Sequence, residues 1–437
     1  MSGQISFLDP MIHQKERTSA KTAVSALSIC QQCSLYPFSR RSFNWTKLKN
    51  RIPNVGVESA IKGALTHNEN SKQALLSPSF PLPIPFTAMR TAFVAALASL
   101  VALPASAVPA ITCTLSQTES GAHTVAAILT NTGTETVKLL NDPRTVLSDA
   151  ETETFTITGA NGSPDFTGIR MKYSPEAVVK ENNPSSFTVL APGESYEVVH
   201  DLSQSFDFSK AGEYQIKALD ALSYVDASGK LVSLKATTEP FVLKLGESIT
   251  PKRDFRPRGS SSRIRQTVGP PFIGCSDSQK QDIEKAIPLA EGYATEAVLY
   301  LERLSTGSNR YTSWFGGFDS GRSSLVKSHF KSIQGKSSST TYDCSTCNKA
   351  GVFAYVYPNQ PGKIYLCPQF WRANLQGTDS KAGTLVHEQS HFDASGGTRD
   401  YAYGQHGCRS LAKSNPDMAV MNADNHEYFA ENTPSEN

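Results

Sequence analysis

The sequence predicts an all-β sandwich followed by an α+β domain. The chain has 437 residues, which is more than one small domain requires. Short β-forming runs separated by Gly, Asn, Pro and Asp occupy residues 108–248, and apolar residues at helical spacing appear after Cys275. Because 39% of the residues are hydrophobic, both regions can bury a core, and global disorder is excluded.

The charge balance argues against a nucleic-acid partner. Lys and Arg number 42 and Asp and Glu number 40, so the formal net charge is only +2. A protein that binds a phosphate backbone is expected to have a strong basic field, and this chain lacks one. Charged residues make up only 19%, and the chain contains 29 Gly and 25 Pro. This composition favours an extracellular protein rich in strands and loops.

A secretory signal peptide is predicted at residues 89–107. Met89-Arg90 provides a positive start, an apolar run extends from Thr91 to Leu103, and Ala105-Ser106-Ala107 is typical of a signal peptidase site. The run is too short to span a bilayer, so we expect a secreted, extracellular protein with no membrane partner. Residues 1–88 precede this leader, so either Met89 is the real start and they are an upstream extension, or the leader is unusually long; we favour the first interpretation.

Residues 108–248 are expected to form the β-sandwich. About seven short strand-like runs in about 140 residues is the pattern of such a fold. The runs are 124–130, 135–140, 154–158, 187–190, 196–200, 214–217 and 240–245. Residues 249–266 are basic and rich in Ser and Gly, so we interpret them as a flexible linker. Lys252-Arg253 resembles a dibasic maturation site, and cleavage of a precursor is expected in this linker.

The pattern becomes α+β over residues 267–437. Apolar spacing predicts helices at 276–304, 323–333 and 380–394, with shorter helical segments after Pro416 and Asn422. The runs 351–357 and 363–367 flank a loop with Pro and Gly, which predicts a β-hairpin.

The helix expected at 380–394 contains the motif His387-Glu388-Gln389-Ser390-His391. Four residues make just over one helical turn, so both imidazoles project from one face and can bind a single Zn²⁺. Glu388 lies beside them and can hold a water molecule against the metal. The motif therefore predicts a zinc hydrolase with one zinc ion per chain.

Zinc in a hydrolase needs a third protein ligand and an open position for water. The metzincin motif would place Gly at position 394 and His at position 397, but the chain has Ala394 and Gly397. Asp400 is a near candidate, because Gly396-Gly397 allows the chain to turn back beneath the metal. The other candidates are His406, Glu427 and Glu431.

Two motifs together resemble the deuterolysin family of zinc metalloendopeptidases, the aspzincins. Their pattern is HExxH with GTxDxxYG, and residues 397–404 read Gly-Thr-Arg-Asp-Tyr-Ala-Tyr-Gly. The resemblance is closer to the peptidyl-Lys metalloendopeptidases of basidiomycete fungi and extends from about Cys275 to the end. This resemblance rests on the segments 353–358, 383–388 and 422–429. The segments 130–133 and 138–143 resemble the propeptides of those enzymes. Residues 1–88 lie outside any resemblance.

The resemblance implies a zincin-like catalytic domain preceded by a propeptide, so that the chain is made as a zymogen. It implies that His387, His391 and Asp400 bind Zn²⁺ and that Glu388 is the general base. Tyr403 is then the phenol that donates a hydrogen bond to the developing oxyanion.

The resemblance also implies the disulfides Cys275–Cys344 and Cys347–Cys367. Two residues separate Cys344 from Cys347, where the relatives tend to have one. Cys408 has no counterpart in the family and is expected to be the unpaired thiol.

Asp424 and Glu427 are interpreted in two ways. On their own, two carboxylates three residues apart indicate a solvated acidic face. The resemblance implies instead that they line the pocket for the residue after the scissile bond, so that the enzyme cleaves Xaa–Lys bonds on the amino side of lysine.

Three functional interpretations remain: this lysine-directed endopeptidase, a broad-specificity deuterolysin-type protease, and a non-catalytic secreted zinc-binding or adhesion protein. The presence of both Glu388 and Tyr403 favours an enzyme. The expected partners are protein and peptide substrates and, before maturation, the chain's own propeptide, and we expect a monomer.

Overall fold

The computed structural model describes residues 108–160, 162–246 and 270–436. The expected extension at 1–88, the signal peptide at 89–107 and the basic linker at 249–266 lie outside these ranges. In the described ranges, no helix combines the length and the apolar character needed to span a membrane.

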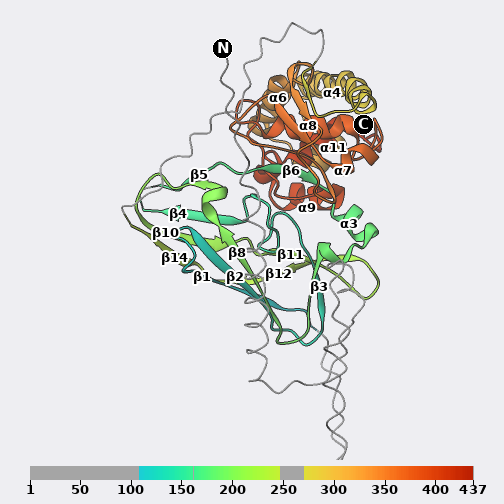
Figure 1. Ribbon diagram of the computed structural model, residues 1–437. Helices are drawn as coiled ribbons and strands as arrows, with labels where there is room; N and C mark the ends of the chain where they lie inside the picture. The colour runs from blue at the N-terminus through green and yellow to red at the C-terminus, as the bar shows by residue number, and fades with distance from the viewer. Residues whose placement is uncertain (1–107, 161, 247–269, 437) are drawn as a thin grey trace, which may run out of the picture. The chain divides into compact units, whose positions relative to one another are not determined.

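Residues 108–246 form three main sheets (Figure 1). One sheet has the order β13 (Thr237–Thr238), β1 (Ile111–Gln117), β2 (Thr124–Asn131) and β8 (Ser195–Asp201). A second has the order β14 (Phe241–Leu245), β10 (Gly212–Ala218) and β4 (Phe155–Gly159). The third has the order β12 (Leu231–Lys235), β11 (Ala221–Val225), β3 (Val137–Leu140) and β7 (Phe187–Leu190), and β5 (Asp165–Phe166) pairs with β9 (Phe206–Asp207).

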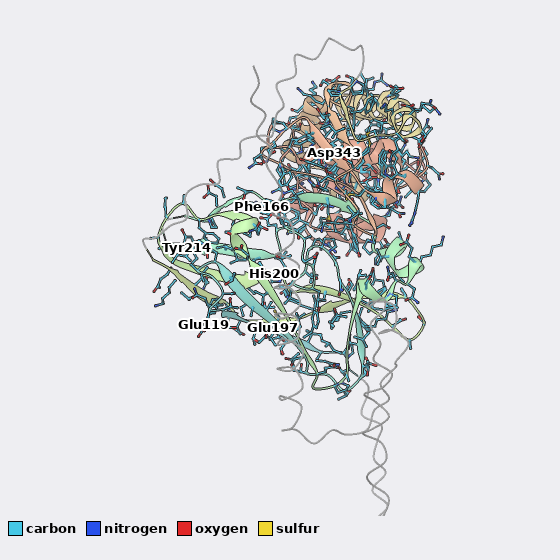
Figure 2. The ribbon with its side chains drawn as sticks, viewed as in Figure 1. Glu119, Phe166, Glu197, His200, Tyr214 and Asp343 are labelled. Carbon is cyan, nitrogen blue, oxygen red and sulfur yellow. A yellow bond between two sulfur atoms is a disulfide. The ribbon has the colours of Figure 1, made fainter. Side chains whose placement is uncertain are left out.

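Strand alternation produces the core of this region. In β10, Tyr214, Ile216 and Ala218 are buried, and the residues between them are exposed. Tyr214, which is labelled in Figure 2, packs edge-on against Phe208 at 5.1 Å, and its hydroxyl donates a hydrogen bond to the carbonyl oxygen of Lys210. The period-2 pattern that predicted the strand is thus the pattern of burial.

Helices dominate residues 270–436. The longest, α4, starts after Ser276, whose hydroxyl accepts the N–H of Gln279 while the Gln279 side chain accepts the N–H of Ser276. The helix α8 packs against α4, α6 and α11 (Figure 1). The helices are α4 (Asp277–Arg303), α5 (Asn309–Phe315), α6 (Ser320–Ile333), α7 (Pro368–Arg372), α8 (Lys381–His391), α9 (Gly404–Ser414), α10 (Pro416–Ala419) and α11 (Ala423–Glu431).

One sheet contains strands from both regions. Its order is β15 (Phe272–Ile273), β16 (Thr341–Asp343), β18 (Lys363–Leu366), β17 (Val352–Val356) and β6 (Arg170–Tyr173). The strands β17 and β18 form the predicted antiparallel hairpin. The edge strand β6 comes from the N-terminal region and pairs antiparallel with β17.

Apolar packing joins the two regions at this sheet. Met171 and Tyr173 share a buried cluster with Val352, Tyr355 and Tyr403. The structure also contains both disulfides that the resemblance implied, Cys275–Cys344 and Cys347–Cys367. Among the described cysteines, Cys113 and Cys408 are free and buried.

The mixed α/β class is confirmed. The expectation that residues 108–248 form an all-β sandwich is not, because α3 (Pro175–Glu181) is helical and β6 belongs to the C-terminal sheet. Ser174 caps α3 by accepting the N–H of Ala177, and Pro175 occupies the first turn, where a missing N–H costs nothing. The local sequence thus ends β6 and starts a helix.

Candidate metal centre and substrate cleft

The two motif histidines lie on one buried face of α8. Ser380 caps this helix by accepting the N–H of Gly383. Gly383 is required here, because a Cβ would lie 2.0 Å from Oε1 of Glu431 on α11. Without a side chain at this position, α8 and α11 approach closely, and His387 and His391 are fully buried.

A glycine turn brings Asp400 to the histidines. The carbonyl of Phe392 accepts the N–H groups of both Gly396 and Gly397, and Gly397 has a φ of +58°. Beyond the turn, Asn422 accepts the N–H of Tyr401 at 2.7 Å, which fixes the backbone next to Asp400. The chain therefore turns back beneath α8, as the double glycine predicted.

The three candidate ligands match tetrahedral zinc. Nε2 of His387 lies 3.0 Å from Nε2 of His391, and Oδ1 of Asp400 lies 3.4 Å and 3.3 Å from these two nitrogens. Tetrahedral ligands at about 2.0–2.1 Å from zinc are about 3.3 Å apart. Oδ1 of Asp400 is buried and has no hydrogen-bond partner among the described residues. A cation between these atoms would satisfy all three.

The outer ring nitrogens fix the tautomers needed for metal binding. Nδ1 of His391 lies 2.8 Å from the carbonyl oxygen of Thr398, so this nitrogen carries the proton. Nδ1 of His387 lies 2.8 Å from Oδ1 of Asp424, a distance at which the carboxylate favours a proton on Nδ1. Both Nε2 atoms are then lone-pair donors, and Asp424 lies where a carboxylate would orient a metal-binding histidine.

Glu388 lies beside this centre and is completely buried. Its Oε1 accepts the backbone N–H of Lys172 at 3.0 Å, and its Oε2 has no hydrogen-bond partner in the described ranges. Burial raises the pKa of the Glu388 carboxyl to about 8, although the neighbouring His387 acts to lower it. A carboxyl in this position can both accept and return a proton.

Tyr403 precedes α9, and its hydroxyl lies at the peptide bond between Met171 and Lys172, which Glu388 also contacts. Its hydroxyl donates a hydrogen bond to the carbonyl oxygen of Met171 at 2.9 Å. The guanidinium of Arg144 lies 4.4 Å from the centre of its ring, and the ring of Tyr173 lies 5.7 Å away. The phenol is thus held where it can donate a hydrogen bond to a carbonyl oxygen next to the metal centre.

An acidic pocket lies between α8 and α11 and contains the side chain of Lys172. The Nζ atom of Lys172 is 2.7 Å from Oε2 of Glu427, 2.8 Å from Oδ1 of Asp379 and 3.7 Å from Oδ1 of Asp424. Burial lowers the pKa of this ammonium, but the three carboxylates more than compensate and raise it well above its ordinary value. The pocket therefore binds a compact cation.

The other candidate ligands do not reach the metal centre. His406 is exposed on α9. Glu427 faces Nδ1 of His387, 3.3 Å away, rather than Nε2, and Glu431 accepts hydrogen bonds from the N–H and hydroxyl of Ser380. His426 is fully buried against His329. The structure therefore favours Asp400 among the alternatives that the sequence left open.

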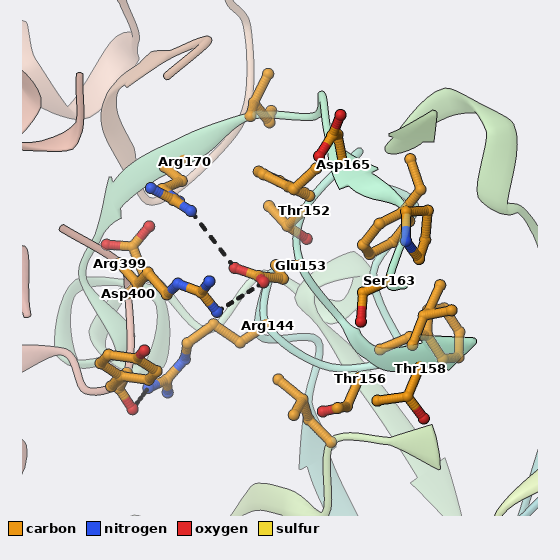
Figure 3. Close-up of a pocket in the computed structure, with 18 of the residues that line it drawn as sticks. Arg144, Thr152, Glu153, Thr156, Thr158, Ser163, Asp165, Arg170, Arg399 and Asp400 are labelled. Atoms are coloured by element: carbon orange, nitrogen blue, oxygen red, sulfur yellow. Dashed lines mark hydrogen bonds and ion pairs between the residues drawn. The ribbon is translucent and has the colours of Figure 1, made fainter. Parts of the chain in front are cut away.

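A cavity of 650 Å³ lies next to Asp400 and Tyr403 and is lined by residues of both regions (Figure 3). Arg170 and Arg399 both point towards Glu153, at 3.7 Å and 2.9 Å (Figure 3). Only the pair between Arg399 and Glu153 links the N-terminal region to the segment that carries Asp400, because Arg170 and Glu153 both belong to the N-terminal region.

Sequence reasoning missed two parts of the site. Asp379 belongs to none of the motifs, although it is one of the carboxylates around the lysine, and its φ of +53° is unusual for a residue with a side chain. The segment Met171-Lys172 gave no strand signal, because all four residues of β6 are buried and show no alternation.

Comparisons with known proteins find relatives over both regions of the chain. The family model described as "Lysine-specific metallo-endopeptidase" matches residues 300–431, and that of the "Deuterolysin metalloprotease (M35) family" matches residues 84–248. The peptidyl-Lys metalloendopeptidase of Grifola frondosa is 44% identical over 71% of this chain and 88% of its own. An extracellular protease of Aeromonas hydrophila is 37% identical over 71% of this chain and 88% of its own.

Among solved structures, a zinc peptidase from Grifola frondosa matches 37% of this chain and 100% of its own chain, at 51% identity and a TM-score of 0.37. The expectation of an enzyme rather than a non-catalytic binding protein is confirmed by these relatives. Family membership also implies a metal, typically zinc, and the cluster of His387, His391 and Asp400 fits one. This chain belongs to the deuterolysin family of metalloproteases, the aspzincins, and is a zinc metalloendopeptidase.

Proposed function

We propose that this chain is a secreted endopeptidase that hydrolyses peptide bonds on the amino side of lysine and is made as a zymogen. The catalytic domain would comprise residues 267–437, with residues 108–248 as propeptide and a maturation site within 249–266. The relative from Aeromonas hydrophila that is named an extracellular protease supports secretion, as does the signal-peptide pattern at 89–107.

His387, His391 and Asp400 would bind one zinc ion per chain. When bound, zinc polarises the scissile carbonyl and lowers the pKa of a water molecule beside it. Glu388 takes a proton from that water and delivers it to the leaving nitrogen. The 3.0 Å between Oε1 of Glu388 and the backbone nitrogen of Lys172 supports this delivery.

Tyr403 would stabilise the negative charge that develops on the carbonyl oxygen. Its hydroxyl already donates to a backbone carbonyl oxygen, that of Met171, at 2.9 Å. The hydrogen bond from a buried phenol becomes stronger as the carbonyl oxygen becomes anionic. It therefore stabilises the transition state more than the bound substrate.

The lysine in the acidic pocket is the observation that carries the substrate preference. Its ammonium contacts Glu427 and Asp379 within 2.8 Å, and Asp424 is 3.7 Å away. Its own peptide nitrogen is the one that faces Glu388. A substrate lysine bound in this way would follow the scissile bond, so cleavage falls on its amino side.

The test is a digest of a protein mixture by the processed enzyme, with the new N-termini read by mass spectrometry. We expect lysine to dominate the first position of the new peptides and a chelator to stop the digestion. The variant Glu427→Gln should lose most of the preference, and Asp417→Asn on the exposed face of α10 is the matched control. New N-termini without lysine enrichment would leave only a broad deuterolysin-type activity.

A further inference from the structure

The strand β6 passes the metal centre and the acidic pocket in the conformation of an extended peptide. It pairs antiparallel with β17, with Lys172 opposite Ala354 and Met171 opposite Tyr355. Addition of a strand to a sheet edge is a common way for a protein to bind an extended peptide. All four residues of β6 are buried.

One peptide bond of β6 is contacted on both sides by the proposed catalytic groups. The hydroxyl of Tyr403 donates to the carbonyl oxygen of Met171 at 2.9 Å, and the N–H of Lys172 donates to Oε1 of Glu388 at 3.0 Å. The N–H of Met171 donates to Oδ2 of Asp400 at 3.0 Å. The bond between Met171 and Lys172 therefore lies where a substrate bond would be cut.

The side chain after this bond fills the acidic pocket. Lys172 has 1% of its side chain exposed, and its Nζ lies 5.0 Å from the ring of Phe353 and 5.3 Å from that of Tyr428. The hydroxyl of Tyr428 donates to Asp379, one of the three carboxylates around the ammonium. A buried ammonium with charged partners and aromatic faces is a strong anchor for the strand.

Residues on either side of the bond hold the strand in this register. Nη1 of Arg170 donates to the carbonyl oxygen of Thr398 at 2.8 Å. The N–H of Ile169 donates to the carbonyl oxygen of Glu151, and that of Ser174 donates to the carbonyl oxygen of Gly351. The strand is thus tied both to the N-terminal region and to the catalytic domain.

We propose that β6 inhibits the precursor as a bound substrate, with Lys172 in the lysine pocket and the Met171–Lys172 bond in the position of the scissile bond. The inference rests on the proposed lysine-directed function and adds the element that blocks it. A propeptide that only covered the cleft would not depend on the charge of one side chain. Here the specificity pocket itself selects the inhibitory residue.

The test uses the unprocessed precursor in a Glu388→Gln background, which prevents self-cleavage. Binding of a fluorescent peptide with one internal lysine is measured by anisotropy, and intact mass confirms that the chain is uncut. We expect Lys172→Ala to bind the peptide at least tenfold more tightly than the parent, because its pocket is open. Lys180→Ala, an exposed lysine on α3, should bind like the parent.

A second variant and a second measurement keep the test decisive. Lys172→Met retains the apolar stem and lacks the charge, so it replaces Lys172→Ala if that variant does not fold. In the parent precursor, an amine-reactive reagent should modify Lys172 at least tenfold more slowly than Lys180. Peptide exclusion by folded Lys172 variants equal to that of the parent, or equal labelling of the two lysines, would overturn the inference.

The proposed function can fail separately. If the processed enzyme shows no preference for lysine in the digest, the lysine-directed function is wrong. If that preference holds while the Lys172 variants exclude peptide like the parent, only the inhibitory role of Lys172 is wrong.

Discussion

Replacing Glu427 by Gln should reduce the lysine preference more than any other single change in the acidic pocket. Oε2 of Glu427 lies 2.7 Å from the Lys172 ammonium, and the side chain is fully buried. The contact is a buried ion pair, and removing one charge from such a pair costs about 3–5 kcal/mol, which corresponds to about 150- to 5000-fold in kcat/KM for an Xaa–Lys substrate.

The neighbouring carboxylates should behave differently. Asp379 lies at a similar distance, but its side chain is 35% exposed, so solvent screening reduces its contribution to about 0.2–1 kcal/mol, or at most about fivefold. Asp424 lies closer to Nδ1 of His387, at 2.8 Å, than to the ammonium, at 3.7 Å. Asp424→Asn should therefore weaken zinc binding by about 10- to 100-fold and lower activity on all substrates.

The assay compares two quenched peptides that differ only in having lysine or its neutral analogue norleucine after the scissile bond. Glu427→Gln should lower the ratio of the two kcat/KM values, whereas Asp424→Asn should lower both values and leave their ratio nearly unchanged. The reasoning is refuted if Asp424→Asn changes the ratio more than Glu427→Gln does.

Three further predictions follow from the site and its surroundings. Glu388→Gln should retain zinc in elemental analysis but lose peptide cleavage, while Asp400→Ala should lose both, because Asp400 is a proposed zinc ligand and Glu388 is not. Gly383→Ala should lower the Tm by several degrees in a thermal scan, since its Cβ would collide with a buried carboxylate. Burial lowers the pKa of His329 to about 4 and of His426 to about 3, so the unfolded chain binds more protons below about pH 6.5, and the Tm should fall as the pH is lowered from 6.5 to 4.

Each of these has a clear contrary outcome. If Asp400→Ala keeps its zinc content while His406→Ala loses zinc, the assignment of Asp400 as the third ligand is wrong. A Gly383→Ala protein as stable as the parent would mean that the Glu431 carboxylate can move aside at no cost. A His329→Gln variant with the same acid-induced loss of Tm as the parent would show that the buried pair does not control it.

The parts of the site that depend on local periodicity could be predicted from the sequence. The spacing of His387 and His391 places both rings on one face of any helix, and the alternation in β10 correctly indicated a strand. Asp400 was one of several candidates until the resemblance selected it, because its position depends on a turn at Gly397 and on the distant Asn422. No local pattern contains that information.

The strand β6 could not be predicted for a different physical reason. It is covered on both faces, so its residues do not alternate, and it has only four residues. Its partner β17 lies far along the chain, and a pairing over such a distance leaves no trace in a single sequence. The role of Asp379 could not be predicted either, because it depends on a contact with Lys172, which is distant in the sequence.

The pairing of β6 with β17 also has a consequence for solubility. β6 occupies the outer edge of its sheet, so β17 would become the edge if the proposed maturation removed the N-terminal region. A newly exposed edge presents unpaired backbone N–H and C=O groups, and such edges recruit strands from other molecules. Before the proposed maturation, the N-terminal region would shield this edge from self-association. Afterwards the extended segments of substrates would compete for the same row of backbone groups, so the processed enzyme would be most prone to aggregate when substrate is scarce.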